Sequence, residues 1–242
     1  MSSCDKTKES FGEARIVFYY RKCDSLTVYN YYRHDLNENR TNTNGEKFYM
    51  VDNLKGAATQ FEHYVFNVVL ADMHYRSSHI PFSSWETDHD LELENLIKKH
   101  FFTECIQLET KASLATTSPA MAPPYNVEYR SEEITDLVVA CKDEIFGLAA
   151  GSSLNDYIET YSAPVNHNFI ISKDRVFLGR LERGMSIPEY LSHHPLAAAS
   201  LYLHFTQKPA TIPSKTQFVI KVTMSDGRQL KYTTAEVEFL DS

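Results

Sequence analysis

The sequence predicts a β-rich α+β fold, in which antiparallel, sandwich-like sheets carry two or three short helices and the chain ends in a β-hairpin. Three observations support this class. Segments rich in β-branched and aromatic residues recur along the chain, and one segment, over 91–102, has the period of a helix. An Asp-Gly pair separates two alternating segments near the C-terminus, which is typical of a hairpin.

The C-terminal hairpin is the strongest local pattern. Apolar and polar residues alternate over 217–224, so one face carries the apolar side chains of Phe218, Ile220, Val222 and Met224. Asp226 and Gly227 favour the positive φ angles of a tight turn. The return strand runs over 229–234. Apolar residues beyond it change parity, which predicts a bulge or bend over 234–236.

Further strands are predicted where β-branched and aromatic residues cluster. The segment 61–70 ends in a Val-rich run that indicates burial on both faces. The expected strands span 15–20, 25–32, 61–70, 134–141 and 201–205, with short apolar pieces at 169–172 and 175–178.

Helices are predicted at three places. Leu93, Leu96, Ile97 and Phe101 recur at helical spacing, and Asp88 or Asp90 is positioned to cap this helix. Ser186 before an early proline indicates a second helix over 186–191. The segment 153–161 is interpreted as a third, short helix, with Ser152 or Ser153 as its cap.

The chain divides into four stretches by composition. Residues 1–12 form a polar tether, 13–111 a β-rich part with one helix, and 125–242 a second β-rich part that ends in the hairpin. Residues 112–124 between them are small, polar and rich in proline, which is typical of a loop or linker.

Composition excludes several classes. The 242 residues carry 24 Lys and Arg against 32 Asp and Glu, and the net charge of −8 argues against a nucleic-acid binder. Apolar runs such as 64–71 fall well short of the ~20 residues of a membrane-spanning helix.

The N-terminus carries a lipidation-like pattern. Ser2 and Ser3 precede Cys4, and a charged polar tether follows, as at the cleavage site of bacterial lipoproteins. Met1 stands where that pattern has Leu, and a chance cysteine in a polar cytosolic N-terminus remains the alternative. The other cysteines are Cys23, Cys105 and Cys141, which are too scattered for a metal or redox motif. Buried inert thiols are the preferred interpretation, and the sequence does not decide their disulfide pairing.

Candidate chemical groups are few. His74, His79 and His89 lie close together with Asp88 and Asp90, but their spacing matches no helical zinc motif, so we expect solvated loop histidines and no metal. His193 and His194 are interpreted as a turn, and Glu132 and Glu133 as surface charge. The sequence lacks the glycine-rich and nucleophile-elbow motifs of nucleotide and hydrolase sites, so no catalytic residue and no cofactor are assigned.

The C-terminal half resembles a group of uncharacterised Bacteroidota envelope lipoproteins. The resemblance rests on three stretches. The first, over 134–161, has a strand and a cysteine followed by Gly-Ser-Ser-Leu-Asn-Asp-Tyr, and the second, over 201–209, has a Leu-rich strand and Lys-Pro. The third, over 217–239, has the Gln-Phe hairpin with its Ser-Asp-Gly turn and a Thr-rich closing strand. It covers about 110 residues and agrees with the Ser-Ser-Cys start. The resemblance implies an envelope location and supplies no catalytic residues.

The leading hypothesis is therefore a non-enzymatic cell-envelope lipoprotein, facing the periplasm or the cell surface, that binds a protein or a glycan and meets the membrane only through its lipid anchor. If the N-terminus is native as written, a cytoplasmic location follows instead. A first alternative is an immunity or inhibitor protein, because an acidic surface steers association with a basic toxin. A second alternative is a hydrolase with a site near His74–Asp90.

Overall fold

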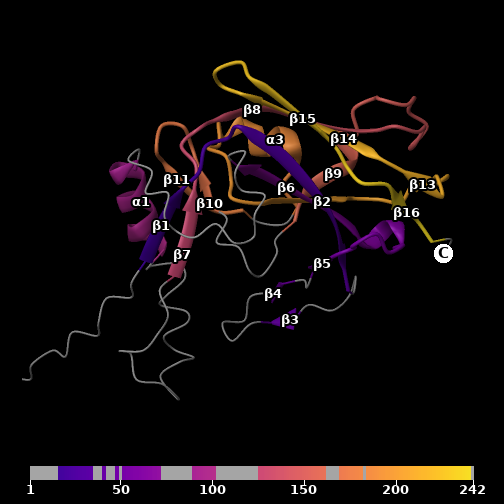
Figure 1. The fold of residues 1–242 in the computed structure, drawn as a ribbon, viewed down its shortest axis with the longest axis horizontal. Coiled ribbons are helices and arrows are strands. Elements are labelled where there is room, and N and C mark those ends of the chain that lie inside the picture. The colour runs from indigo at the N-terminus through magenta and orange to yellow at the C-terminus, as the bar shows by residue number, and fades with distance from the viewer. Residues whose placement is uncertain are drawn as a thin grey trace, which may run out of the picture.

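The computed structural model describes residues 16–34, 40–41, 47–48, 51–71, 89–101, 125–161, 169–181 and 184–240. The protein has the predicted β-rich α+β fold. Two antiparallel sheets form its main body, and a smaller group of elements, comprising β1, β7, β10, β11 and α1, gathers at one end (left in Figure 1). No helix of the described residues is long and apolar enough to cross a membrane.

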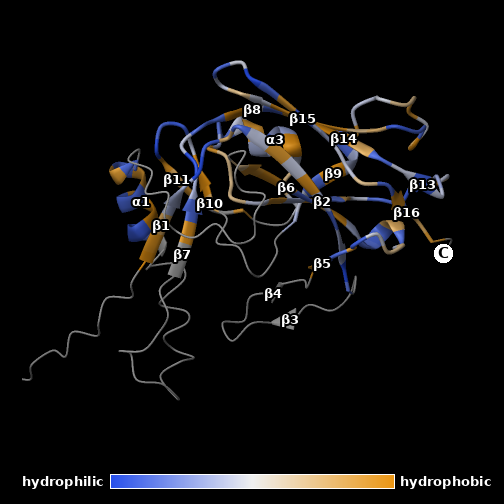
Figure 2. Ribbon diagram, in the orientation of Figure 1, coloured by the Kyte–Doolittle hydropathy of each residue, from blue (hydrophilic) through white to orange (hydrophobic). Residues whose placement is uncertain are grey.

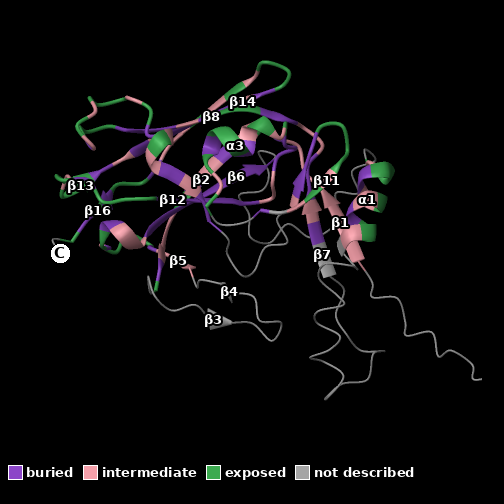
Figure 3. Cartoon of the chain, turned by 180° about the vertical axis from the view of Figure 1, so that it is seen from behind, coloured by how far each residue is buried: buried purple, intermediate pink, exposed green. Residues whose placement is uncertain are grey.

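The larger sheet has five antiparallel strands in the order β5-β2-β6-β12-β9. Its strands are β2 (Ser25–Arg33), β5 (Val51–Asn53), β6 (Tyr64–Ala71), β9 (Ile158–Thr160) and β12 (Leu201–Phe205). Central β6 is buried along its whole length (Figure 3), which confirms burial on both faces. The sheet draws strands from both sides of the 112–124 segment, which itself lies outside the described residues.

The smaller sheet of the main body has the order β15-β14-β8 and contains the predicted hairpin. Its strands are β8 (Ile134–Cys141), β14 (Phe218–Met224) and β15 (Gln229–Thr233). The chain leaves the sheet over 234–236, as predicted, and β16 (Val237–Glu238) pairs with β13 (Lys215–Thr216) instead. A separate pair joins β3 (Arg40–Thr41) to β4 (Lys47–Phe48).

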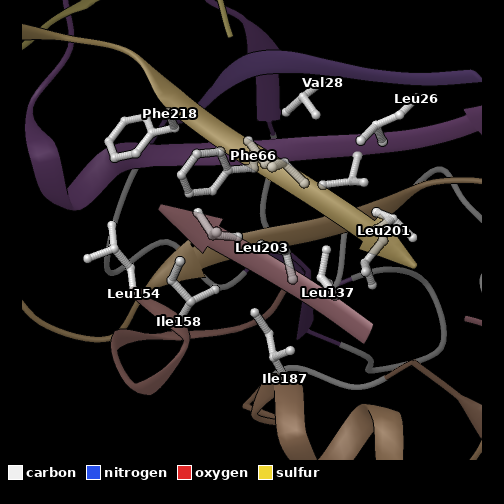
Figure 4. Close-up of a cluster of buried hydrophobic side chains, with 14 of the residues drawn as sticks. Leu26, Val28, Phe66, Leu137, Leu154, Ile158, Ile187, Leu201, Leu203 and Phe218 are labelled. Atoms are coloured by element: carbon white, nitrogen blue, oxygen red, sulfur yellow. The ribbon is translucent and has the colours of Figure 1, made fainter. Parts of the chain in front are cut away.

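The hydrophobic core lies between the inner faces of these two sheets (Figure 4). Phe218 of β14 lies 5.0 Å from Phe66 of β6, measured between ring centroids, and each ring is fully buried. Leu203 of β12 and Leu137 of β8 belong to the same core. Ile187 of helix α3 (Ile187–Ser192) lies at one end of this core. The four alternating apolar residues of the hairpin are all buried, because their face of β14 packs in the core against the larger sheet.

The smaller group of elements forms a second apolar cluster. β1 (Ile16–Tyr20) pairs with β7 (Tyr125–Tyr129), and this pair is parallel, which departs from the antiparallel arrangement expected throughout. Parallel strands need a long crossover, and more than a hundred residues separate these two strands. β10 (Phe169–Ile171) and β11 (Phe177–Arg180) form an antiparallel hairpin beside them.

Helix α1 (Leu91–Phe101) covers this cluster and confirms the predicted helix. Its hydrophilic and apolar sides are distinct (Figure 2), and Leu93 and Ile97 are buried against Val127 and Tyr129 of β7. The Asp90 side chain accepts a hydrogen bond from the backbone N–H of Leu93 at 3.1 Å. Asp90 is therefore the capping residue, as one of the two predicted alternatives.

One predicted helix is wrong. Residues 153–161 form a single 3-10 turn, η4 (Asn155–Tyr157), followed by strand β9. The Asn155 side chain accepts from the backbone N–H of Val139 at 3.0 Å and donates to the carbonyl of Leu137 at 2.7 Å. These side-chain bonds hold the turn against β8, and the pairing of β9 with β12 satisfies backbone groups that a helix would have bonded internally. The helix at 186–191 is confirmed as α3, with Ser186 accepting from the backbone N–H of Glu189.

Candidate functional site beside Arg130

The predicted site residues lie mostly outside the described residues. Cys4, His74 and His79 fall there, as does Asp88. His89 is described, and its Nδ1 lies 2.5 Å from Glu94 Oε1. The same carboxylate oxygen accepts from the Tyr129 hydroxyl at 2.7 Å, so these contacts join the start of α1 to β7. The described residues hold no group of three or more side chains that would bind a metal ion.

The described cysteines are free and buried. Cys23 is fully buried and Cys141 is 2% exposed, whereas Cys105 lies outside the described residues. Burial raises the pKa of both thiols above the ordinary value. Since the thiolate is the nucleophile, neither sulfur is suited to catalysis.

The interpretation of Glu132 and Glu133 as surface charge is wrong. Glu132 accepts a hydrogen bond from the backbone N–H of Cys23 at 2.5 Å and pairs with Arg228. Glu133 is only 8% exposed and lies 3.0 Å from Nδ1 of His194. The two carboxylates therefore connect the start of β8 to Cys23, to Arg228 and to His194. The turn predicted at 193–194 is confirmed, because His193 caps the end of α3.

The larger sheet carries a polar pair on the face opposite the main core. His204 of β12 is 2% exposed, and its Nε2 lies 2.9 Å from Glu159 Oε1 on the neighbouring strand β9. Tyr161 contacts the histidine ring edge-on, with 5.2 Å between ring centroids. A histidine beside a carboxylate is a common acid/base arrangement. The pocket defined below does not reach this pair.

A small pocket lies where the second apolar cluster meets residues 196–199, and we call it the seam pocket. Its volume is about 40 Å³. Ile97 of α1 and Phe169 of β10 form part of its wall, together with residues 127–130. Three consecutive alanines, 197–199, face it from the other side, and their short side chains leave the space open.

Arg130 is the charged group buried in this wall. Its side chain is completely buried, and it follows β7 directly. Nε donates to the backbone carbonyl of Leu70 at 2.9 Å, and Nη2 donates to Glu128 Oε2 at 3.2 Å. Nη1 is buried without a hydrogen-bond partner within the described part of the chain. A buried donor without a partner is costly, and the complete burial of the side chain also closes Nη1 to solvent.

Sequence reasoning missed Arg130 for a physical reason. The residue stands in the charged stretch Glu128-Tyr129-Arg130-Ser131-Glu132, where an arginine ordinarily faces solvent. Its burial depends on β6 and on residues 196–199, which are distant in the sequence. No local signal in the sequence distinguishes it from its charged neighbours.

The fold and the site together define a β-rich α+β sandwich protein with a small, mostly apolar pocket whose lining includes Arg130. Comparisons of the chain with family models, with curated proteins and with solved structures give no match.

Proposed function

We propose that this chain is a non-enzymatic binding protein of the bacterial cell envelope, anchored through lipid at Cys4, which holds part of a protein or glycan partner in the seam pocket. The observation that carries the binding proposal is the seam pocket itself, a space of about 40 Å³ lined mostly by apolar residues together with Glu128 and Arg130. Pockets of apolar walls with a few polar groups are the usual form of ligand sites.

The chemistry of the pocket favours binding over catalysis. A guanidinium stays protonated at any physiological pH, so Arg130 does not transfer a proton. Its position is set by the hydrogen bond to the carbonyl of Leu70, which belongs to the central strand β6. A pocket wall that is held by a central strand is organised before the partner arrives, which lowers the entropy lost on binding.

The envelope location is supported by the sequence. Ser2 and Ser3 before Cys4, the polar tether and the resemblance of the C-terminal half to Bacteroidota lipoproteins all agree. Protein purified from native membranes should carry a diacylglycerol-sized mass on Cys4. An unmodified Cys4 in the soluble fraction would exclude the anchor and leave the binding proposal standing.

The binding proposal is tested by filling the pocket. Ala198→Leu places a larger side chain in the wall, and Ala149→Leu makes the same change at an exposed position outside it. Wild type and both variants are measured by biolayer interferometry against purified envelope glycans and envelope proteins. We expect Ala198→Leu to lose binding by at least tenfold and Ala149→Leu to retain it, with the partner recovered unchanged in mass. Equal binding by Ala198→Leu would refute the seam pocket as the site, and a cleaved partner would refute the non-enzymatic function.

A further inference from the structure

We infer that the outer face of the smaller sheet binds a phosphate monoester carried by a sugar, with the ammonium groups of Lys221 and Lys231 as its two cationic contacts. This site goes beyond the proposed function, because it shares no residue with the seam pocket. The inference follows from the register of the hairpin, from the lack of carboxylate partners for these lysines, and from the groups around them.

The hairpin register places the two lysines side by side. Lys221 of β14 is paired directly with Lys231 of β15. Further along the same register, the backbone N–H of Thr234 donates to the carbonyl of Phe218 at 2.9 Å, which marks a hydrogen-bonded pair. Such pairs recur at every second residue, so the two lysines form a non-hydrogen-bonded pair, in which the opposing Cα atoms are only ~4.5 Å apart. We call these two residues the lysine pair.

The lysine pair faces solvent. Along β14 the buried residues Ile220 and Val222 point into the core, and Lys221 between them is exposed on the opposite face. Lys231 is exposed on β15. Because residues directly opposite each other leave the same face of a sheet, both ammonium groups lie on the outer face of the hairpin.

Carboxylate partners are lacking at this position. Neither ammonium of the lysine pair has an ion pair within the described part of the chain. By contrast Lys215, beyond the start of β14, lies 3.9 Å from Glu236 and 3.3 Å from Glu238. Asp136 of β8 is exposed on the same outer face, opposite Thr223, and it forms no ion pair with either lysine.

Two adjacent cations are a local conflict in the sheet. Like charges directly opposite each other on neighbouring strands repel, and this repulsion destabilises the hairpin. Conflicts of this kind are expected at functional sites, where binding gives the compensation. An anion between the two ammonium groups removes the repulsion. The net charge of the chain is −8, so this pair stands out as a cationic place on an acidic protein.

The charge and the donor type select a phosphate monoester. Two ammonium groups carry a charge of +2, and a phosphate monoester carries about −1.5 to −2 near neutral pH. Its oxygens accept hydrogen bonds from both ammonium groups at once. Lysine binds phosphate as a point charge, whereas the planar fork of arginine is better matched to a carboxylate.

The rest of the face favours a sugar as the carrier of the phosphate. Thr223 and Gln229 are paired on one side of the lysine pair, and Thr233 lies on the other side. Hydroxyl and amide groups donate and accept hydrogen bonds, as sugar hydroxyls require. An anionic membrane is recognised by clusters of about 4–8 basic residues, and single-stranded nucleic acid by aromatic side chains. The outer face of these three strands carries neither.

The test titrates the intact protein with matched probes. Glucose 6-phosphate is compared with glucose, which lacks the phosphate, and with glucuronate, which has a carboxylate at the same position. Inorganic phosphate and vesicles that contain phosphatidate present the same anion without a sugar. Binding is followed by NMR through the backbone amides of 219–223 and 229–233. We expect glucose 6-phosphate to shift these signals and to bind at least tenfold more tightly than each other probe.

Three variants locate the effect. Lys221→Gln combined with Lys231→Gln should weaken glucose 6-phosphate binding at least tenfold. Lys98→Gln combined with Lys99→Gln removes the same charge from exposed positions on α1 and should leave binding unchanged. Asp136→Asn removes the carboxylate from the outer face and should strengthen binding about twofold to threefold. Amide spectra show that each variant is folded, and the comparison of probes on the wild type stands without them.

Each contrary result overturns the inference. Equal or tighter binding of glucuronate would make the face a general anion site, and tighter binding of inorganic phosphate or of phosphatidate vesicles would exclude a sugar carrier. Undiminished binding by the double variant at Lys221 and Lys231 would refute the lysine pair, as would a lack of binding by every probe. The seam pocket is tested separately by Ala198→Leu, so failure here leaves the proposed function standing.

Discussion

Arg228, in the turn of the C-terminal hairpin, donates through Nη2 to the carboxylate of Glu132, which lies 96 residues earlier in the chain. Nη1 of the same guanidinium donates to the backbone carbonyl of Cys23 at 3.0 Å and to Asp24 at 3.2 Å. One side chain therefore joins the hairpin turn to the segment between β1 and β2 and to the start of β8. The hairpin turn is thereby bonded to two segments that are distant from it in the sequence.

Replacing Arg228 should weaken the fold through its partners. Arg228→Leu leaves the Glu132 carboxylate and the Cys23 carbonyl without this donor, and a part-buried group that loses its partner costs about 1–3 kcal/mol. Because Arg228 is 37% exposed, we expect the lower half of that range. Urea unfolding measures the change, with Lys231→Ala on the exposed side of β15 as the control. Equal stability of Arg228→Leu and Lys231→Ala would show that the connection contributes nothing.

The hairpin strand β14 should be essential to the fold. Ile220 is fully buried in the core, and Ile220→Ala should destabilise the protein by about 2–5 kcal/mol through the cavity it leaves. Lys221→Ala, the exposed neighbour, should change stability by less than about 0.5 kcal/mol. Thermal unfolding of both variants checks the contrast.

The turn and the whole strand give a stricter form of the same test. Gly227 has a φ of +85°, which a β-branched residue adopts only with strain, so Gly227→Val should also destabilise the protein. Deleting residues 215–242 removes both β14 and β15 and leaves β8 alone in its sheet, so we expect no cooperative unfolding transition to remain. A truncated chain that melts like the full protein would mean that the hairpin serves only to bind a partner.

The start of α1 should depend on pH. The hydrogen bond from Arg175 lowers the pKa of Asp90 below its ordinary value, and the bond from the backbone N–H of Leu93 lowers it further. Because the folded-state pKa is depressed, the ionised carboxylate stabilises the fold above the unfolded pKa of about 3.9, and this stabilisation is lost as the pH falls through the lower folded value. Asp90→Asn keeps the cap but loses the charge, so it should cost about 0.5–1 kcal/mol at pH near 6.

The comparison across pH isolates the charge. Thermal unfolding of wild type and Asp90→Asn should differ near neutral pH and converge at pH well below 3.9. Asp136→Asn, an exposed substitution on β8, should show no such convergence. A difference that stays constant with pH would assign the effect of Asp90 to packing.

The buried thiols should be unreactive in the folded protein. Burial raises the pKa of Cys23 and of Cys141, so little thiolate forms at neutral pH. Iodoacetamide followed by peptide mass spectrometry should find both thiols unmodified in buffer and modified in guanidinium chloride. Rapid alkylation of Cys23 in buffer would contradict its complete burial in the folded protein.

Local patterns predicted much of this fold correctly. The alternation over 217–224 and the Asp-Gly pair identified the hairpin, its buried face and its turn, because a period of two and a positive φ are properties of neighbouring residues. The spacing of Leu93, Leu96 and Ile97 likewise identified α1, and Asp90 its cap. These features depend on interactions within a few residues.

Tertiary structure decided the remaining features. Residues 153–161 became a turn and a strand because Asn155 bonds to β8 and β9 pairs with β12. β1 pairs in parallel with β7, more than a hundred residues away. Arg130 and Glu132 look like surface charges in the sequence, but distant segments bury the first and bond the second. The sequence by itself thus determined the elements whose stabilising contacts are local. The candidate site required the fold, because the burial of a charge depends on which distant segments pack around it.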